Sequence, residues 1–256
     1  MKINNHAALN IHYTKRVMQQ EKEPNRNYRF LDLVMALFVT VLITSNIASS
    51  AKIVDWGFSI FGVPMAFDAG TLLFPISYIF GDVLVEVYGF KRSRRVIWIG
   101  FGALAVCAVT LWIVRLLPGE TTWQQQTGQA AYDAVLGGMS SGGIVIASLV
   151  AYFMGEYSNS VVMAVMKVRT GGRHLWLRTI TSTLVGEGVD SLLFAFIASL
   201  FGVFPWEVFA SLVLTNYLFK VAVEALFTPF TYRIVNGLKK AENEDFYDRG
   251  TRFNPL

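Results

Sequence analysis

The sequence has 256 residues, of which 54% are hydrophobic and only 16% are charged, and its mean hydropathy is +0.45. Soluble domains carry about 25% charged residues, so this composition favours a membrane protein. The net charge of +4 does not indicate a nucleic-acid binder, because the basic residues form short clusters between apolar runs. The single cysteine, Cys107, lies in an apolar run and excludes a disulfide framework within one chain.

The N-terminal 29 residues are polar and basic, without the apolar core and cleavage site of a signal peptide. We therefore expect a cytoplasmic tail at 1–29, a six-helix transmembrane domain at 30–237 and a cytoplasmic tail at 238–256. The mixed charge of the C-terminal tail predicts a mobile segment.

Six segments are apolar over the roughly 20 residues that a membrane helix needs. They are 30–51, 69–88, 96–117, 143–166, 179–201 and 206–235. The second, fifth and sixth each hold two charges, so we expect them to score poorly in hydropathy. Between the spans, 52–68 predicts a strand-like or re-entrant hairpin that turns at 62–64. The polar stretch 119–133 predicts a loop, with or without a short surface helix.

Basic residues are distributed unequally between the two sides of this six-span arrangement. Of the 22 Lys and Arg residues, only Lys52 and Arg115 fall in outer segments and Lys220 falls well inside a span. All the others lie in the tails, the inner loops or the adjoining helix ends. Positive charges near span ends favour the cytoplasmic side, so both termini are expected there.

Two short sequences repeat one pattern on oppositely directed spans. "SYIFGD" at 77–82 and "STLVGE" at 182–187 share the spacing Ser-x-x-x-Gly-acid. The pattern predicts a three-plus-three inverted repeat, although so short a match can also arise by chance. Gly81 and Gly186 have a second interpretation, since small residues let membrane helices approach closely.

Several ionisable residues fall well within the spans, although each costs about 2.5–3.5 kcal/mol at a helix centre. They are Asp82, Glu86, Glu156, Glu187, Asp190, Lys220 and Glu224. Such groups face the protein interior or a water-filled cavity. Helix depth places Asp82, Glu187 and Lys220 at similar levels, which predicts a polar site near the midplane.

Helical spacing arranges these charges in stripes, each with a further polar residue. The stripes are Tyr78–Asp82–Glu86, Thr183–Glu187–Asp190 and Asn216–Lys220–Glu224, and Asn46 and the pair Glu156–Asn159 could join them. A Lys220–Glu224 bridge within one helix would be structural, and it leaves five acids without another buried base. Those acids must be protonated, bind a cation or bind a ligand.

Motifs of other protein classes are missing from the sequence. There is no phosphate-binding loop, so ATP hydrolysis by that route is excluded. The three histidines lie in tails or loops, which argues against a histidine metal site or a histidine-based triad in the membrane. No span carries the spaced arginines of a voltage sensor. We therefore expect no cofactor, no metal and no enzymatic activity.

Two stretches resemble the signature regions of the queuosine precursor transporters, also called the vitamin-uptake-like family. They are "DAGTLLFPISYIFGDVLVEVYGFKRSRRVIW" and "TGGRHLWLRTITSTLVGEGVDSLLF", and the resemblance covers about 31–237. It implies a six-helix importer of 7-deazaguanine precursors, chiefly 7-cyano-7-deazaguanine, in the bacterial inner membrane. It also implies an all-α fold similar to the substrate-binding subunits of energy-coupling-factor transporters. Through its motifs, the resemblance implies that Asp82, Glu86, Glu187 and Asp190 are residues of the functional site.

Residues and resemblance together define a set of expected site residues. We expect substrate contacts from Asn46, Tyr78, Asp82, Glu86, Glu187, Asp190, Asn216 and Lys220. We expect proton coupling, if it occurs, at Asp82, Glu86, Glu156, Glu187 or Glu224. The partners are then a small deazaguanine and the lipid bilayer, with no nucleic acid, and the oligomeric state stays open.

Two other functions stay open at this point. The chain could be a binding subunit that needs a separate ATPase module, although its first span has only Ala36 as a small residue near the cytoplasmic end. It could also be an intramembrane enzyme with paired carboxylates, which we rank lower. The preferred precursor and the energy source are not decided by the sequence.

Overall fold

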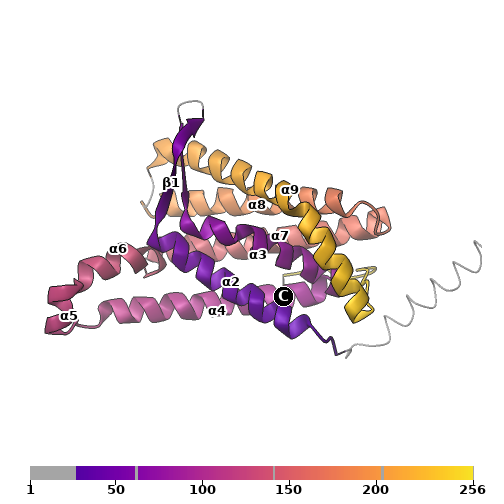
Figure 1. Ribbon diagram of the computed structural model, residues 1–256, viewed down its shortest axis with the longest axis horizontal. Coiled ribbons are helices and arrows are strands. Elements are labelled where there is room, and N and C mark those ends of the chain that lie inside the picture. The colour runs from indigo at the N-terminus through magenta and orange to yellow at the C-terminus, as the bar shows by residue number, and fades with distance from the viewer. Residues whose placement is uncertain (1–26, 61–62, 141, 203–204, 256) are drawn as a thin grey trace, which may run out of the picture.

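A computed structural model describes residues 27–60, 63–140, 142–202 and 205–255 (Figure 1). In chain order its elements are α2 (Leu31–Ala51), β1 (Ile53–Ile60), β2 (Val63–Asp68), the 3₁₀ helix η1 (Ala69–Leu73), α3 (Phe74–Val83), the π-helical turn η2 (Leu84–Tyr88), α4 (Phe90–Leu116), α5 (Thr121–Gln126), α6 (Gly128–Ser140), α7 (Gly142–Thr170), α8 (Leu175–Leu200), the 3₁₀ turn η3 (Trp206–Val208) and α9 (Phe209–Glu242).

Helices occupy all six segments in which the sequence predicts spans. Within the described residues, four helical stretches are long and apolar enough to cross a membrane: Leu31–Ala51, Phe90–Leu116, Gly128–Thr170 and Leu175–Leu200. The last of these, α8, was expected to score poorly, and that expectation was wrong because its long apolar flanks outweigh its two acids. The α3–η2 segment and α9 do not meet the same test.

The long helices lie along one axis of the molecule (Figure 1). Helices α4, α7 and α8 run side by side, and α2 and α9 cross them obliquely. The start of α2 and the end of α9 lie at one end, which we call the inner end, and α5 lies at the other, the outer end.

Two segments between the predicted spans take up regular structure at the outer end. Strands β1 and β2 form an antiparallel hairpin in which Ile53 pairs with Asp68 and Ile60 with Val63. This confirms the expected strand-like hairpin, while the expected turn begins at residue 62, outside the described residues. The expected loop at 119–133 is mostly helical, in α5 and the first half of α6.

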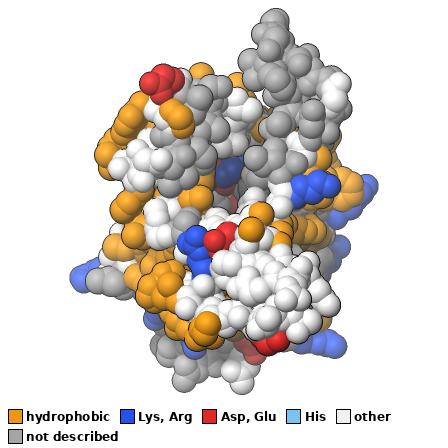
Figure 2. Space-filling model, turned by 90° about the vertical axis from the view of Figure 1, so that its left-hand side faces the viewer, with side chains coloured by type: hydrophobic (Ala, Val, Ile, Leu, Met, Phe, Trp, Pro, Cys, Tyr) orange, Lys and Arg blue, Asp and Glu red, His pale blue; other side chains and the backbone are white. Residues whose placement is uncertain are grey.

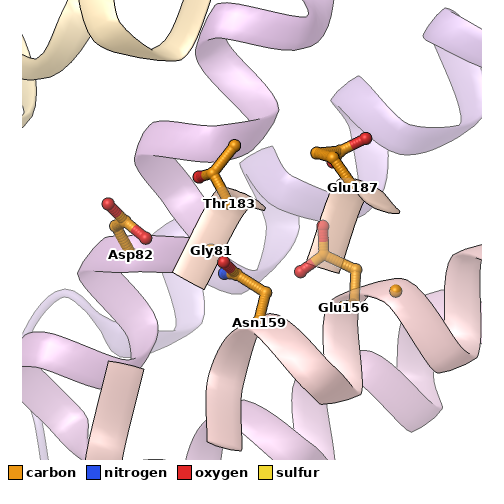
Figure 3. Close-up of a pocket in the computed structure, with 7 residues that line it drawn as sticks. Gly81, Asp82, Glu156, Asn159, Thr183 and Glu187 are labelled. Atoms are coloured by element: carbon orange, nitrogen blue, oxygen red, sulfur yellow. The ribbon is translucent and has the colours of Figure 1, made fainter. Parts of the chain in front are cut away.

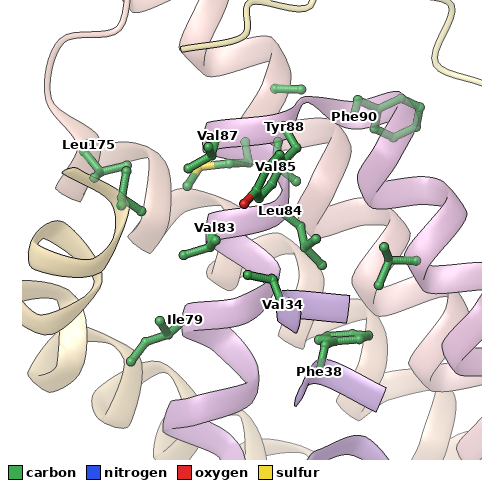
Figure 4. Close-up of a cluster of buried hydrophobic side chains, with 14 residues drawn as sticks. Val34, Phe38, Ile79, Val83, Leu84, Val85, Val87, Tyr88, Phe90 and Leu175 are labelled. Atoms are coloured by element: carbon green, nitrogen blue, oxygen red, sulfur yellow. The ribbon is translucent and has the colours of Figure 1, made fainter. Parts of the chain in front are cut away.

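The main apolar core surrounds η2 near the inner end (Figure 4). All five residues of η2 are buried, and they pack against Val34 and Phe38 of α2 and Leu175 of α8. The chain leaves η2 at Gly89, whose φ of +85° favours glycine. A side chain there would also overlap the Phe246 ring, so this sharp exit holds the polar residues of α3–η2 in place.

The C-terminal segment 243–255 packs against the inner end, so the expectation of a mobile tail was wrong. Glu242 accepts hydrogen bonds from the backbone N–H groups of Arg29 (3.0 Å) and Phe30 (2.7 Å) at the start of α2. Asp248 accepts one from the Phe90 N–H at the start of α4 (3.0 Å). Carboxylates at helix N-termini are stabilised by the free amides and the helix dipole, which explains why so polar a segment is held.

Candidate functional site

Three helices enclose a polar cavity in the middle of the bundle (Figure 3). It has about 280 Å³ of empty space, a volume that includes space open to solvent, and it leaves room for about one water molecule. The lining comes from α3 (Gly81, Asp82), α7 (Gly155, Glu156, Asn159) and α8 (Thr183, Glu187). Both acids of the repeated Ser-x-x-x-Gly-acid pattern therefore face one cavity.

Glycines let these helices approach one another. A Cβ on Gly186 of α8 would lie 2.7 Å from the Asn159 Cβ and 3.0 Å from the Gly155 carbonyl oxygen of α7. Gly186 is thus a helix-contact residue, as the second interpretation of the motif expected. Gly81 is different, because a Cβ there would lie 3.3 Å from the Glu156 carboxylate, on the cavity side.

Lys220 of α9 is held by two acids of α8. Its Nζ lies 2.7 Å from Glu187 Oε2 and 2.5 Å from Asp190 Oδ2. The bridge from Lys220 to Glu224, which the sequence left as one alternative, does not form in the described structure. Glu224 is 1% exposed, and neither of its carboxylate oxygens has a hydrogen-bond partner among the described residues. One base thus serves two acids, and Glu224 is left outside this ion pair.

Asp82 is the most enclosed acid of the cavity lining. It is 2% exposed, and its Oδ2 accepts no hydrogen bond within the described part of the chain. The side chains of Thr179 and Asn159 lie near this carboxyl group, and the buried Asn159 Oδ1 also lacks a donor. The cavity therefore presents acceptor oxygens that await hydrogen-bond donors.

We name the acids and the base of this region the cavity cluster: Asp82, Glu156, Glu187, Asp190, Lys220 and Glu224. It holds five carboxyl groups and one amine, so the excess of acids that the sequence predicts is present here. Figure 2, which views the outer end, shows a central hollow with acidic and basic side chains on its floor. In the described residues, no group of three or more His, Cys, Asp or Glu side chains could hold a metal ion.

Glu86 does not lie in this cavity, although the sequence places it one helical turn from Asp82. Segment η2 is π-helical, so residues four apart no longer share one stripe. Glu86 Oε1 instead lies 2.8 Å from Arg178, 2.6 Å from Lys239 and 3.5 Å from Lys167. The expected substrate contact from Glu86 finds no support in this arrangement.

Lys167 and Arg178 were assigned to an inner loop, and that assignment was wrong. They lie on α7 and α8 and are 1% and 0% exposed. Asp245 joins them, 2.6 Å from Lys167 and 2.8 Å from Lys239. Burial works to raise the pKa of Asp245, but the two lysines outweigh it and hold that pKa below its ordinary value. We name Glu86, Lys167, Arg178, Lys239 and Asp245 the inner cluster.

Of the eight expected contact residues, only Asp82 and Glu187 are among those that line the cavity. Asp190 and Lys220 are not, although Lys220 pairs with Glu187 of the lining. The Asn46 side-chain amide donates to the Leu42 carbonyl oxygen of its own helix (2.8 Å). Asn216 lies on α9 and is half-buried. Tyr78 lies on α3, and its side chain is outside the described part of the structure. Asn159 and Thr183 also line the cavity, and the only feature of the sequence that indicated them was their helical spacing from Glu156 and Glu187.

Comparisons with known proteins agree on one family. The family described as "Putative vitamin uptake transporter" matches residues 68–234. The chain is 27% identical over 164 residues to a "Probable queuosine precursor transporter" of Bacillus subtilis, covering 64% of this chain and 69% of that protein.

The chain is 26% identical over 195 residues to the "Queuosine precursor transporter" of Escherichia coli, covering 75% of this chain and 80% of that protein. It is also 26% identical over 170 residues to a "Probable queuosine precursor transporter" of Haemophilus influenzae, covering 65% of this chain and 67% of that protein. No solved structure matches the chain. With its apolar helices and a family match over most of its length, the chain belongs to the vitamin uptake transporter family and is a multi-pass membrane transporter, not an enzyme.

Proposed function

We propose that this chain imports a precursor of queuosine, a 7-deazaguanine base with a 7-cyano or 7-aminomethyl substituent. The names of the three relatives support the substrate class. The observation that carries the proposal is the acceptor-rich cavity, in which Asp82 Oδ2 and Asn159 Oδ1 are buried without donors among the described residues.

The chemistry of the base fits such a cavity. A deazaguanine presents a ring N–H and an amino group on one edge, and a carboxylate accepts hydrogen bonds from both. Asp82 is the proposed acceptor. The exocyclic oxygen of the base needs a donor, which Asn159 or Lys220 would supply. Leaving the Asp82 oxygen without a donor costs about 1–3 kcal/mol, which the ligand would recover.

We propose alternating access around the cavity cluster as the transport mechanism. The cavity leaves room for about one water molecule, too little for a flat bicyclic base, so α3, α7 and α8 would have to separate to admit it. The excess of carboxyl groups supports coupling to protons, with Asp82, Glu156, Glu187 and Glu224 as the acids that would carry them. Trapping of the precursor by later intracellular reactions would drive uptake equally well.

The proposed arrangement in the membrane has six crossing helices, with α3–η2 and α9 as the second and sixth. The charged residues in the middle of these segments, Asp82, Glu86, Lys220 and Glu224, lie in the interior clusters, where they escape contact with lipid. Lys91, Arg92, Arg94 and Arg95 at the inner end support cytoplasmic termini in a bacterial inner membrane. The facing motifs on α3 and α8 support an inverted repeat, and the six-helix arrangement supports a likeness to substrate-binding subunits of energy-coupling-factor transporters.

Uptake by the purified chain in liposomes tests the function directly. Vesicles that contain only this protein should accumulate labelled 7-cyano-7-deazaguanine above protein-free vesicles, and excess unlabelled base should compete. Accumulation only after an ATPase module is added would favour the binding-subunit alternative. Recovery of a chemically altered base from the vesicles would favour the alternative of an intramembrane enzyme.

A further inference from the structure

The inner cluster ties together the elements that also form the cavity. Glu86 follows Asp82 on the α3–η2 segment, Lys167 follows Asn159 on α7, and Arg178 precedes Thr183 on α8. At about 1.5 Å per residue, Arg178 lies only about 8 Å along α8 from Thr183. Lys239 adds α9. One carboxylate oxygen of Glu86 therefore connects η2, α7, α8 and α9 directly beneath the cavity.

The centre of the inner cluster is buried, and its contacts converge on Glu86 Oε1, whereas Glu86 Oε2 and Arg178 Nε have no hydrogen-bond partner among the described residues. Glu86 is 0% exposed and faces three cations. Lys167 also donates to the Glu86 backbone carbonyl (2.5 Å), and Arg178 donates to the Thr170 hydroxyl (3.2 Å). Hydrogen bonds between charged groups are short and stronger than neutral ones, so a separation of the helices at this end has to break them.

The C-terminal segment closes over the same end. Asp245 bridges Lys167 and Lys239 from this segment, and the Phe246 N–H donates to the Val87 carbonyl oxygen of η2 (3.4 Å). Together with the Asp248 bond to the start of α4, these contacts hold the inner ends of the helices against one another. The outer end is hollowed instead (Figure 2).

We propose that the inner cluster is the inner gate of the transporter, assembled in this structure, and that Glu86 is its hub. This inference rests on the proposed transport function. A substrate in the cavity cannot leave towards the inner end while Glu86 holds Arg178, Lys167 and Lys239 together. Glu86 is thus a gating residue that acts through the closure of the helices, and it does not touch the substrate.

Thr179 provides a reporter position between the gate and the cavity. It is 0% exposed, follows Arg178 directly and lies near Asp82. In a Cys107→Ser background, Thr179→Cys leaves one thiol in the chain. A membrane-impermeant maleimide, added to inside-out vesicles, then measures how often the inner end opens, without any substrate.

Glu86→Gln should raise the rate of labelling at position 179 roughly tenfold, as expected from the loss of a hydrogen bond between charged groups. Lys239→Gln should raise it in the same direction and is the milder variant, because Lys239 is 19% exposed and its loss leaves fewer buried charges unpaired. Lys240→Gln is the matched control, since the exposed neighbouring lysine lies outside the cluster, and it should not change the rate.

Unchanged labelling in Lys239→Gln and in folded Glu86→Gln would overturn the gate. Binding of 7-cyano-7-deazaguanine, measured on the same gate variants with the native Thr179, which lies near Asp82, separates the two proposals. Normal gating with no binding rejects the proposed substrate alone, whereas binding with no change in labelling rejects the gate alone.

Discussion

The two charged clusters differ in their balance of acids and bases. The cavity cluster has five carboxyl groups and one amine, and several of its oxygens lack donors among the described residues. The inner cluster has two carboxylates and three cations in mutual contact. Every charged group of the inner cluster contacts one of opposite sign, and a cluster matched in this way stabilises one arrangement of helices. A cluster with five acids and one base instead remains able to bind a ligand or protons.

The largest expected effect comes from removing the acceptors of the cavity. The combined variant Asp82→Asn and Glu187→Gln should reduce uptake by about a hundredfold or more, because it replaces acceptor-only carboxylates with amides that also donate. Uptake is measured in a strain that depends on external precursor. The exposed Glu207→Gln in η3 is the control, and normal uptake by the double variant would refute the assigned site.

The stability of the protein should depend more on the inner cluster than on the cavity cluster. Glu86→Gln leaves buried cations without their counter-charge and should lower the free energy of unfolding by about 3–5 kcal/mol. Asp190→Asn should lower it by only about 1–2 kcal/mol, because Lys220 keeps Glu187. Thermal unfolding in detergent measures both. Equal losses would remove the distinction between a matched and an unmatched cluster.

Glycine substitutions separate helix contact from cavity shape. Gly186→Ala places a Cβ against Asn159 and the Gly155 backbone and should cost about 1–3 kcal/mol of stability through overpacking. Gly81→Ala meets only the ends of the Glu156 and Asn159 side chains, both of which line the cavity, so it should weaken substrate binding more than it lowers the unfolding temperature. Gly102→Ala, with nothing within 4 Å, is the control. The reverse order of effects would contradict this division.

The smallest expected effect concerns Asp245, at the exposed rim of the inner cluster. Its pKa is lowered in the folded state, so its contribution exists above its unfolded pKa and disappears as the pH falls through the folded value. Asp245→Asn should cost less than about 1 kcal/mol near neutral pH, since the side chain is 45% exposed. The difference from the parent protein should begin to shrink below about pH 4 and vanish only below the lowered folded pKa, and a difference that grows with acidity would contradict the assignment.

The sequence predicts the helices and the hairpin well because apolar length and turn residues act locally. It also indicates the facing acids of α3 and α8, because a charge in an apolar span needs an interior partner. Whether those acids bind the substrate is still a prediction. The length of α9, which extends to Glu242, does not follow from hydropathy, because the inner end of that helix is polar.

The inner cluster could not be predicted because its formation depends on backbone geometry and on long-range contacts. The π-helical turn that rotates Glu86 away from Asp82 has no signature in the residue pattern. Lys167 and Arg178 look like interfacial anchors in sequence, since the positive-inside rule counts basic residues without regard to their contacts. The C-terminal segment looks mobile because its partners, the amides at the starts of α2 and α4, are far away in the sequence.

Direct binding to the purified protein tests the central claim that the cavity cluster recognises a deazaguanine. Titration calorimetry should show saturable binding of 7-cyano-7-deazaguanine that is tighter than that of guanine. Asp82→Asn should weaken it at least about tenfold, as expected for a hydrogen bond to a charged group, and Lys240→Gln should leave it unchanged. Equal affinity for both bases, or full affinity in Asp82→Asn, would contradict the claim.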